Sequence, residues 1–237
     1  MMNRRLIFSV LCASLLWLGH SPVLMADDLA DGLMRYARRD YAGALQLWRP
    51  LAEQGVAKAQ LKLATLYQLG HGVPQDYKTA ASWYRRAADQ GDAQAQNGLG
   101  YMYAEGRGVP QDYMAAAIWY RKAAEQGYDV AQNDLGVLYA KGQGVPQDHQ
   151  LSAYWCRKAA EHGNEYAQFN LGNKYAAGQG VPQNYVEAHR WFNLASSLAF
   201  LHDLREDAAK NRDILAAKMT PTQIAEAQAL ARDWKPK

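Results

Sequence analysis

Serine is the first residue type whose surroundings would reveal hydrolytic chemistry in this chain. In serine penicillin-binding enzymes the nucleophilic serine is followed three residues later by lysine. The four serines beyond the N-terminal segment lack that lysine: Ser82, Ser152, Ser196 and Ser197 are followed by Arg85, Trp155, Ala199 and Phe200. No His-Glu-x-x-His, Gly-x-Ser-x-Gly or phosphate-loop motif occurs either. The sequence therefore predicts no catalytic residue.

The histidines and repeated aspartates are the other residues that could form a metal or acid–base site. The histidines after residue 26 occupy unrelated positions of the repeat described below, which favours solvated or capping roles: His71, His149, His162, His189 and His202. Asp76, Asp112 and Asp148 are 36 residues apart, so we expect them on successive units rather than in one carboxylate pair. The sequence predicts no metal site and no cofactor.

These spacings follow an internal repeat of 36 residues. Its signature is a loop of the form Gly-x-Gly-Val-Pro-Gln-Asp or Asn, which occurs at residues 70–76, 106–112, 142–148 and 178–184. A constant period of this size is typical of stacked helical units, each of which covers its hydrophobic face with its neighbour. The sequence thus predicts an all-α fold, an α/α superhelical solenoid with a long concave wall.

Residues 92–127 show how one unit is built. Asp92 can cap a first helix that ends near Tyr103 or Glu105, and Asp112 can cap a second helix after the glycine loop. Gly100 lies inside the first helix although glycine costs roughly 1 kcal/mol there relative to alanine. Its equivalents are also small, so we expect two helices to cross closely at this position: Ala64, Gly136 and Gly172.

The second helix carries large side chains that we expect in the core. One position holds Tyr84, Tyr120, Cys156 and Phe192, so Cys156 should replace a packed aromatic ring rather than act as a reactive thiol. The preceding position holds a tryptophan in every unit, and its alanine neighbours favour core packing over carbohydrate binding: Trp83, Trp119, Trp155 and Trp191.

The repeat divides the chain into seven segments. We expect a signal peptide at 1–26, an N-terminal cap and partial repeat at 27–55, full units at 56–91, 92–127, 128–163 and 164–199, and a C-terminal helical cap at 200–237. The first helix of the N-terminal cap is expected at about 29–39. The C-terminal cap should contain a helix at 200–218 and a second helix opened by a Thr220 capping box.

The N-terminus and the charge balance bear on location and partners. Arg4 and Arg5 precede an apolar run from Leu6 to Leu18, and Ala26 offers a small residue for cleavage. An uncleaved anchor is the alternative, although the run is short for a bilayer. We expect export of a mature chain from Asp27 to the periplasm or medium, with no stable membrane insertion. The net charge of +3 falls to about +1 without Arg4 and Arg5, which favours neither nucleic acid nor an anionic membrane as partner.

The quoted motifs resemble the Sel1-like repeat, a 36-residue relative of the tetratricopeptide repeat. The resemblance rests on residues 95–103, the glycine loop and residues 117–127, and it extends over about 41–199. It implies an adaptor or scaffold in bacterial signalling, envelope assembly or host interaction. Some cysteine-rich family members were described as binding or hydrolysing penicillin, but this chain has no cysteine pair after residue 26 to match them.

The resemblance also implies where a partner would bind, because the first helices of such stacks line the concave side. Positions two residues before and after the repeated Leu63, Leu99, Leu135 and Leu171 should face that side and vary between units. Asparagine can bond both groups of a peptide backbone, and aromatic rings can anchor it. The predicted partner-binding residues are Asn97, Tyr101, Asn133, Phe169 and Asn173. Packing between neighbouring first helices is the alternative role for several of them.

Three functions remain open at this point. The first is a non-catalytic, monomeric scaffold that binds a protein or peptide. The second is an enzyme or binder acting on β-lactams or peptidoglycan, which would need a nucleophile or metal cluster that the motifs do not show. The third is a structural module of the cell envelope or of polysaccharide export.

Overall fold

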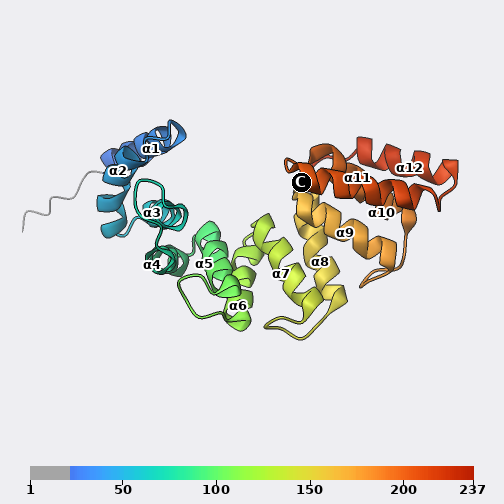
Figure 1. The fold of residues 1–237 in the computed structure, drawn as a ribbon, viewed down its shortest axis with the longest axis horizontal. Helices are drawn as coiled ribbons and strands as arrows, with labels where there is room; N and C mark the ends of the chain where they lie inside the picture. The colour runs from blue at the N-terminus through green and yellow to red at the C-terminus, as the bar shows by residue number, and fades with distance from the viewer. Residues whose placement is uncertain (1–21) are drawn as a thin grey trace, which may run out of the picture.

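The computed structural model describes residues 22–237, and this part contains twelve α-helices and no strand. In chain order they are α1 (Pro22–Ala37), α2 (Tyr41–Glu53), α3 (Ala57–Leu69), α4 (Tyr77–Asp89), α5 (Ala93–Glu105), α6 (Tyr113–Glu125), α7 (Asp129–Lys141), α8 (His149–Glu161), α9 (Glu165–Ala177), α10 (Tyr185–Leu198), α11 (His202–Ala216) and α12 (Pro221–Arg232). Successive helices pack into a curved stack, as Figure 1 shows. The predicted all-α solenoid is confirmed.

Local sequence signals begin the helices where they were expected. The Asp92 Oδ1 atom accepts a hydrogen bond of 2.9 Å from the Ala95 amide at the start of α5. The repeated carboxylate or amide after each glycine loop caps the following helix in the same way: Asp76 for α4, Asp112 for α6, Asp148 for α8 and Asn184 for α10. These aspartates are therefore capping residues on separate units, as predicted.

The glycine loops attach each unit to the one before it. Gly106 ends α5 with a left-handed φ of 66°, and Gly108 follows with a φ of 72°. A β-carbon on Gly108 would overlap the backbone carbonyl of Tyr77, at the start of α4 in the preceding unit. The Gln111 amide then closes the loop by donating a 2.7 Å hydrogen bond to the Ala104 carbonyl. Only glycine allows this close backbone approach.

The small residues inside the first helices face the aromatic position of the second helices. A β-carbon on Gly100 would lie 2.6 Å from the Tyr120 ring, and one on Gly172 would lie 2.7 Å from the Phe192 ring. Gly136 faces the Cys156 sulfur instead, and Cys156 is 1% exposed and forms no disulfide. The close crossing and the packed cysteine are both confirmed. The four tryptophans also pack in the hydrophobic clusters between units.

A buried glutamine joins each unit to its predecessor. Its side-chain amide donates to a carbonyl near the end of the preceding second helix, over 3.0–3.4 Å: Gln60 to Ala52, Gln96 to Ala88, Gln132 to Ala124 and Gln168 to Ala160. Each of these carbonyls also accepts a hydrogen bond from the glycine amide that follows its helix, so the glutamine uses the second lone pair of the oxygen to tie the two units together.

Both ends of the stack carry helices outside the regular pattern. At the N-terminus α1 begins at Pro22, earlier than the predicted helix at 29–39, and includes the end of the predicted signal peptide; residues 1–21 lie outside the described part. At the C-terminus α11 and α12 pack against α10, and the predicted Thr220 capping box with Gln223 is present. The last residue folds back on α8, where the Lys237 ammonium lies 2.6 Å from the Glu161 carboxylate.

Candidate functional site on the inner face

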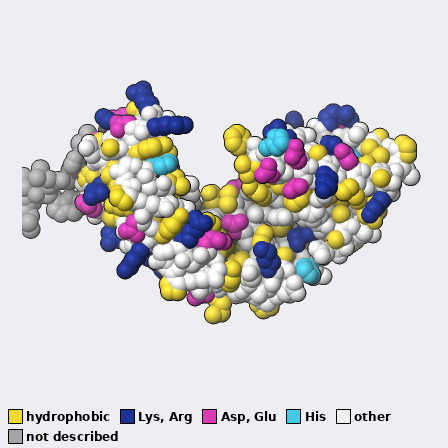
Figure 2. All heavy atoms as spheres, in the orientation of Figure 1, with side chains coloured by type: hydrophobic (Ala, Val, Ile, Leu, Met, Phe, Trp, Pro, Cys, Tyr) yellow, Lys and Arg dark blue, Asp and Glu magenta, His cyan; other side chains and the backbone are white. Residues whose placement is uncertain are grey.

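The first helices of the units line the concave side of the stack. In Figure 1 α3, α5 and α7 lie toward the hollow, while α4 and α6 lie outside them. Figure 2 shows the hollow between the N-terminal helices and the raised C-terminal end. The five predicted partner-binding residues all belong to the first helices α5, α7 and α9.

The five residues differ in how much surface they offer. Asn97 and Asn133 are each 9% exposed, so their side chains are almost entirely packed against neighbours. Phe169 is half-buried, and its ring centroid lies 5.8 Å from that of Phe192. Tyr101 and Asn173 are also half-buried and retain part of their surface in contact with solvent. Binding of a partner by these five residues stays a prediction.

Polar side chains link neighbouring first helices across this face. The Asn97 amide nitrogen lies 3.5 Å from a carboxylate oxygen of Asp134, which connects α5 to α7. Asn170 donates 3.0 Å to the Asn133 amide oxygen and so connects α9 to α7. Asn211 donates 3.3 Å to the Asn173 oxygen and connects α11 to α9. We call these side chains, together with Tyr101 and Phe169, the inner-face row.

Asp134 is the acidic side chain of the row. Burial raises the pKa of its carboxyl from an ordinary 3.8 to about 6, because a charged carboxylate is poorly solvated there, and the Asn133 amide offsets part of this effect. The Asn97 oxygen beside it is buried and has no hydrogen-bond partner among the described residues. The row therefore contains a buried amide oxygen, that of Asn97, to which no described side chain or backbone group donates a hydrogen bond.

The loop after α5 covers one side of Tyr101. The Arg107 guanidinium lies 5.3 Å from the ring centroids of both Tyr101 and Tyr77, and its Nη1 is 3.2 Å from the Tyr77 hydroxyl. These contacts hold the Tyr101 ring in one orientation, because the guanidinium is attracted to the ring face. A fixed aromatic ring is a suitable anchor for an extended ligand, since little side-chain entropy remains to be lost.

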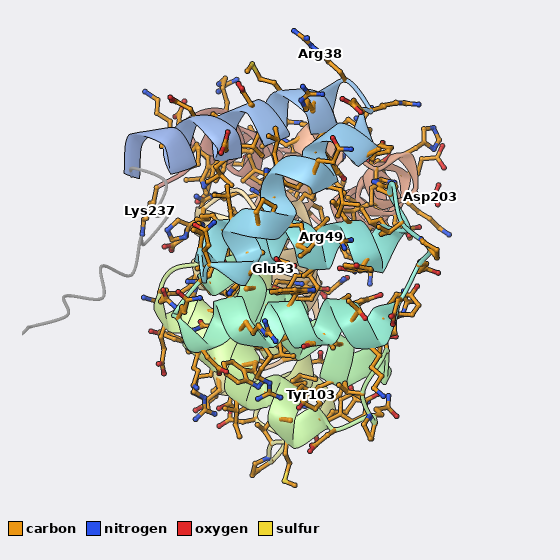
Figure 3. The ribbon with its side chains drawn as sticks, turned by 90° about the vertical axis from the view of Figure 1, so that its left-hand side faces the viewer. Arg38, Arg49, Glu53, Tyr103, Asp203 and Lys237 are labelled. Carbon is orange, nitrogen blue, oxygen red and sulfur yellow. The ribbon has the colours of Figure 1, made fainter. Side chains whose placement is uncertain are left out.

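Reasoning from the sequence missed Asp134 and Asn170 as members of the row. Both occupy one position of the repeat, but that position holds Lys62 and Gly98 in earlier units, so the period gave no signal. A repeated arginine–tyrosine contact was also missed, although the 36-residue period could have shown it: Arg49 with Tyr67, Arg85 with Tyr103, Arg121 with Tyr139 and Arg157 with Tyr175. Figure 3 looks along the stack and shows Arg49 where α2 crosses α3.

The histidines behave only partly as predicted. His202 is exposed and His162 caps the end of α8, but the prediction is wrong for His189, which is 2% exposed inside α10. Burial lowers the pKa of His189 because the charged ring is poorly solvated. His71 stacks on Tyr41, with ring centroids 4.1 Å apart. Among residues 22–237 no group of three or more His, Cys, Asp or Glu side chains has the geometry to hold a metal ion.

The comparison with protein families agrees with this architecture. A family model for the Sel1 repeat matches five consecutive segments: 26–56, 57–92, 93–128, 129–164 and 165–200. The chain belongs to the Sel1 repeat family. The resemblance stated from the motifs is thereby confirmed, and the Sel1 match also includes the N-terminal helices. A search of curated proteins gave no match.

Solved structures with the same fold extend the comparison. A protective antigen present in uropathogenic Escherichia coli strains, which displays an SLR fold, is 37% identical with a TM-score of 0.80; the match covers 88% of this chain and 44% of that one. A Sel1 repeat protein from Oxalobacter formigenes is 28% identical with a TM-score of 0.66, covering 82% and 86% of the two chains. The present chain thus spans less than half the length of the antigen.

Sel1 repeat proteins are in general scaffolds for protein interaction. A solenoid of this kind offers an extended, curved wall for binding. Within the described residues no helix is long and apolar enough to cross a bilayer.

Proposed function

We propose that this Sel1 repeat protein is a non-catalytic scaffold of the bacterial cell envelope, or a secreted one, that binds a partner protein or peptide on its concave face. The observation that carries the proposal is the inner-face row. It combines an oriented, half-exposed aromatic ring at Tyr101 with amide groups that can bond a peptide backbone.

Two members of the row are best placed to contact a partner. Asn173 receives the Asn211 bond through its oxygen, and its amide nitrogen makes no hydrogen bond within residues 22–237, so it can donate to a ligand carbonyl. Tyr101 offers a ring face and a hydroxyl. Asn97 and Asn133 act mainly by holding α5, α7 and α9 in register, because little of their surface is accessible.

Site-specific photo-crosslinking in cells tests the binding face. A benzoylphenylalanine at position 101 replaces one aromatic ring with another and should capture one defined partner. The matched control carries the same residue at Ile118, which is 56% exposed on the outer helix α6. Adding Asn173→Ala to the position-101 variant should reduce capture. Capture at position 118 but not at 101 would move the binding face to the outside.

The cellular location of the protein needs a separate test, because the prediction of export rests on the N-terminal segment alone. We expect the purified protein to have the mass of a chain that starts at Asp27 and to leave the cell with the periplasmic fraction on osmotic shock. A full-length mass in the cytoplasmic fraction would contradict export without affecting the binding face.

A further inference from the structure

Three departures from the repeat meet at one point between α7, α8 and α9. Ser152 occupies a position that is alanine in the other units, Cys156 replaces an aromatic ring, and Lys174 replaces an apolar residue. Their equivalents are all buried and apolar in character: Ala80, Ala116 and Ala188; Tyr84, Tyr120 and Phe192; Leu66, Met102 and Leu138. A single change of this kind has no functional meaning by itself. Three changes that line one cavity indicate that the cavity has a function.

The missing ring leaves an open space. A cavity of about 220 Å³ lies where the Cys156 side chain is shorter than the ring of the other units, and Ser152, Cys156 and Lys174 all line it. Val137, Asn170 and Asn173 from α7 and α9 complete its inner side, so the cavity belongs to the inner face. We call it the Lys174 pocket. Large-to-small changes in a core normally destabilise it, which makes an unfilled space here costly to retain.

Lys174 is buried without an opposite charge. The residue is 6% exposed, and no carboxylate lies within 4.0 Å of its ammonium in the part of the chain that the structure describes. Its ammonium forms no hydrogen bond among residues 22–237, whereas the Ser152 hydroxyl is used in a 2.6 Å bond to the Gly136 carbonyl. Burial accordingly lowers the pKa of Lys174. Lysine is rarely covered to this extent without a partner for its charge, and its ammonium keeps an opening to solvent, because it is not among the fully buried atoms that lack a hydrogen bond.

The remaining groups at the pocket fit an anion. Lys141 and Gln179 also line it and add further donors, and no Asp or Glu is present in the lining. The Asn173 amide nitrogen, which makes no bond within the described residues, lies at the same rim. The walls formed by Val137 and Cys156 are apolar and would surround a short aliphatic stem. A carboxylate on such a stem matches both the charge and the walls.

We propose that the Lys174 pocket binds a carboxylate of the partner peptide, with Lys174 as the counter-ion, Asn173 as a second donor and the space above Cys156 as the seat of the carboxylate's stem. The carboxylate can come from an acidic side chain or from the end of a chain, since both present the same group. This inference rests on the proposed function in assigning the group to a peptide, but the pocket can be tested without that partner.

Nuclear magnetic resonance of the labelled full chain provides the test. Three probes are titrated: N-acetyl-glutamate N-methylamide, its uncharged glutamine analogue and N-acetylglycine, which mimics a chain end. The expected result is a saturable shift of the Asn173 side-chain and Gly136 backbone signals with at least one carboxylate probe, at a Kd on the order of 1 mM for so small a ligand. The glutamine analogue should bind at least about 10-fold more weakly, because it lacks the charge that meets Lys174.

Two variants serve as controls that preserve the repeat. Lys174→Met introduces the residue found at Met102, and Cys156→Phe introduces the ring found at Phe192, so circular dichroism should show both to be folded. Lys174→Met should weaken binding roughly 10-fold or more, and Cys156→Phe should abolish it by filling the space. The inference is overturned if neither carboxylate probe shifts these signals, or if both variants bind as the parent does. If position 101 still captures a partner in that case, the scaffold function stands and only the pocket is rejected.

Discussion

Asp134 is the residue of the inner-face row whose ionisation is coupled to stability. Because its pKa is about 6 in the folded chain and 3.8 ordinarily, the folded state holds the proton more tightly than the unfolded state between these values. This group therefore lowers the stability progressively as the pH rises from about 4 to about 6. Its effect is constant above that window.

Replacement of Asp134 by Asn should remove this cost. Asn170 occupies the same repeat position, so the amide is compatible with the fold. We expect Asp134→Asn to raise the free energy of unfolding by roughly 1–3 kcal/mol at pH 7 and by much less at pH 4. Urea denaturation of both proteins at the two pH values measures the difference. An equal gain at both values would show that Asp134 is not a buried, perturbed carboxyl.

Gly100 and Gly136 form a matched pair for testing the helix crossing. Alanine at Gly100 would press against the Tyr120 ring at 2.6 Å, whereas alanine at Gly136 would meet the Cys156 sulfur at 2.9 Å beside the Lys174 pocket. We expect Gly100→Ala to cost about 1–3 kcal/mol and Gly136→Ala to cost clearly less, as the pocket can absorb the displacement. Thermal unfolding of the two variants compares them, and equal losses would contradict the role assigned to the ring.

The burial of individual side chains could be predicted where the residue type recurs at the same position of each repeat. The small residue at Gly100 and the buried position of Cys156 recur in every unit, so comparison of the units within one sequence was sufficient. Asp134 and Lys174 are exceptions to the repeat. Their environment depends on side chains from two adjacent units, and this requires three-dimensional contacts that no local pattern encodes.

Among the elements, the glycine loops are the part whose conformation is most constrained. Gly108 and Gly127 both have a left-handed φ, of 72° and 89°, but only Gly108 approaches the backbone of the preceding unit. A β-carbon on Gly127 would meet nothing within 4 Å. Comparison of alanine substitutions at the two positions therefore separates the energetic cost of the left-handed conformation from the cost of the close backbone contact.

We expect Gly127→Ala to cost about 1 kcal/mol, which reflects the left-handed conformation alone. Gly108→Ala should lower the free energy of unfolding by about 1–3 kcal/mol more than Gly127→Ala does. The reason is that the Tyr77 carbonyl belongs to the backbone and cannot move aside easily. Chemical denaturation followed by circular dichroism gives both values. Similar losses for the two variants would mean that the loop can withdraw from the preceding unit without penalty.

The helices were predictable because their end signals are local. Asp92, Asp112 and Thr220 each cap a helix within three residues of their own position, so the sequence alone places these starts. The start of α1 was not predicted, since the assigned signal peptide overlaps it and no glycine loop precedes it. The buried joints formed by Gln60 and its equivalents were also missed; the 36-residue period marks the glutamine, but it does not identify the carbonyl that the glutamine bonds.

At the scale of the whole molecule, the C-terminal cap should determine the stability of the last unit. Helices α11 and α12 both pack on α10, and Trp234 adds to the cluster that contains Trp191 and Leu194. A chain that ends at Leu198 would expose this surface. We expect a lower urea midpoint and increased binding of a hydrophobic dye for that truncation.

Removal of Lys237 alone provides the control, since it breaks the surface ion pair with Glu161 and leaves the helices in place. An exposed pair of this kind contributes little, so the free energy of unfolding should change by less than about 0.5 kcal/mol. A truncation at Leu198 that unfolds like the full chain would show that the cap is not needed to cover α10.

The joints between units also have a consequence for how such a gene can change length. Outside their own unit, the second glycine of each loop and each joining glutamine contact the unit before them, so recombination between two copies of the 36-codon repeat would create a junction already used elsewhere. A shorter or longer descendant could thus arise in a single genetic event and still fold. The Lys174 pocket is different, because Ser152 and Cys156 come from one unit and Lys174 from the next. A crossover between them would keep the solenoid and lose the pocket, so a lineage could gain or lose this specificity without passing through an unstable intermediate.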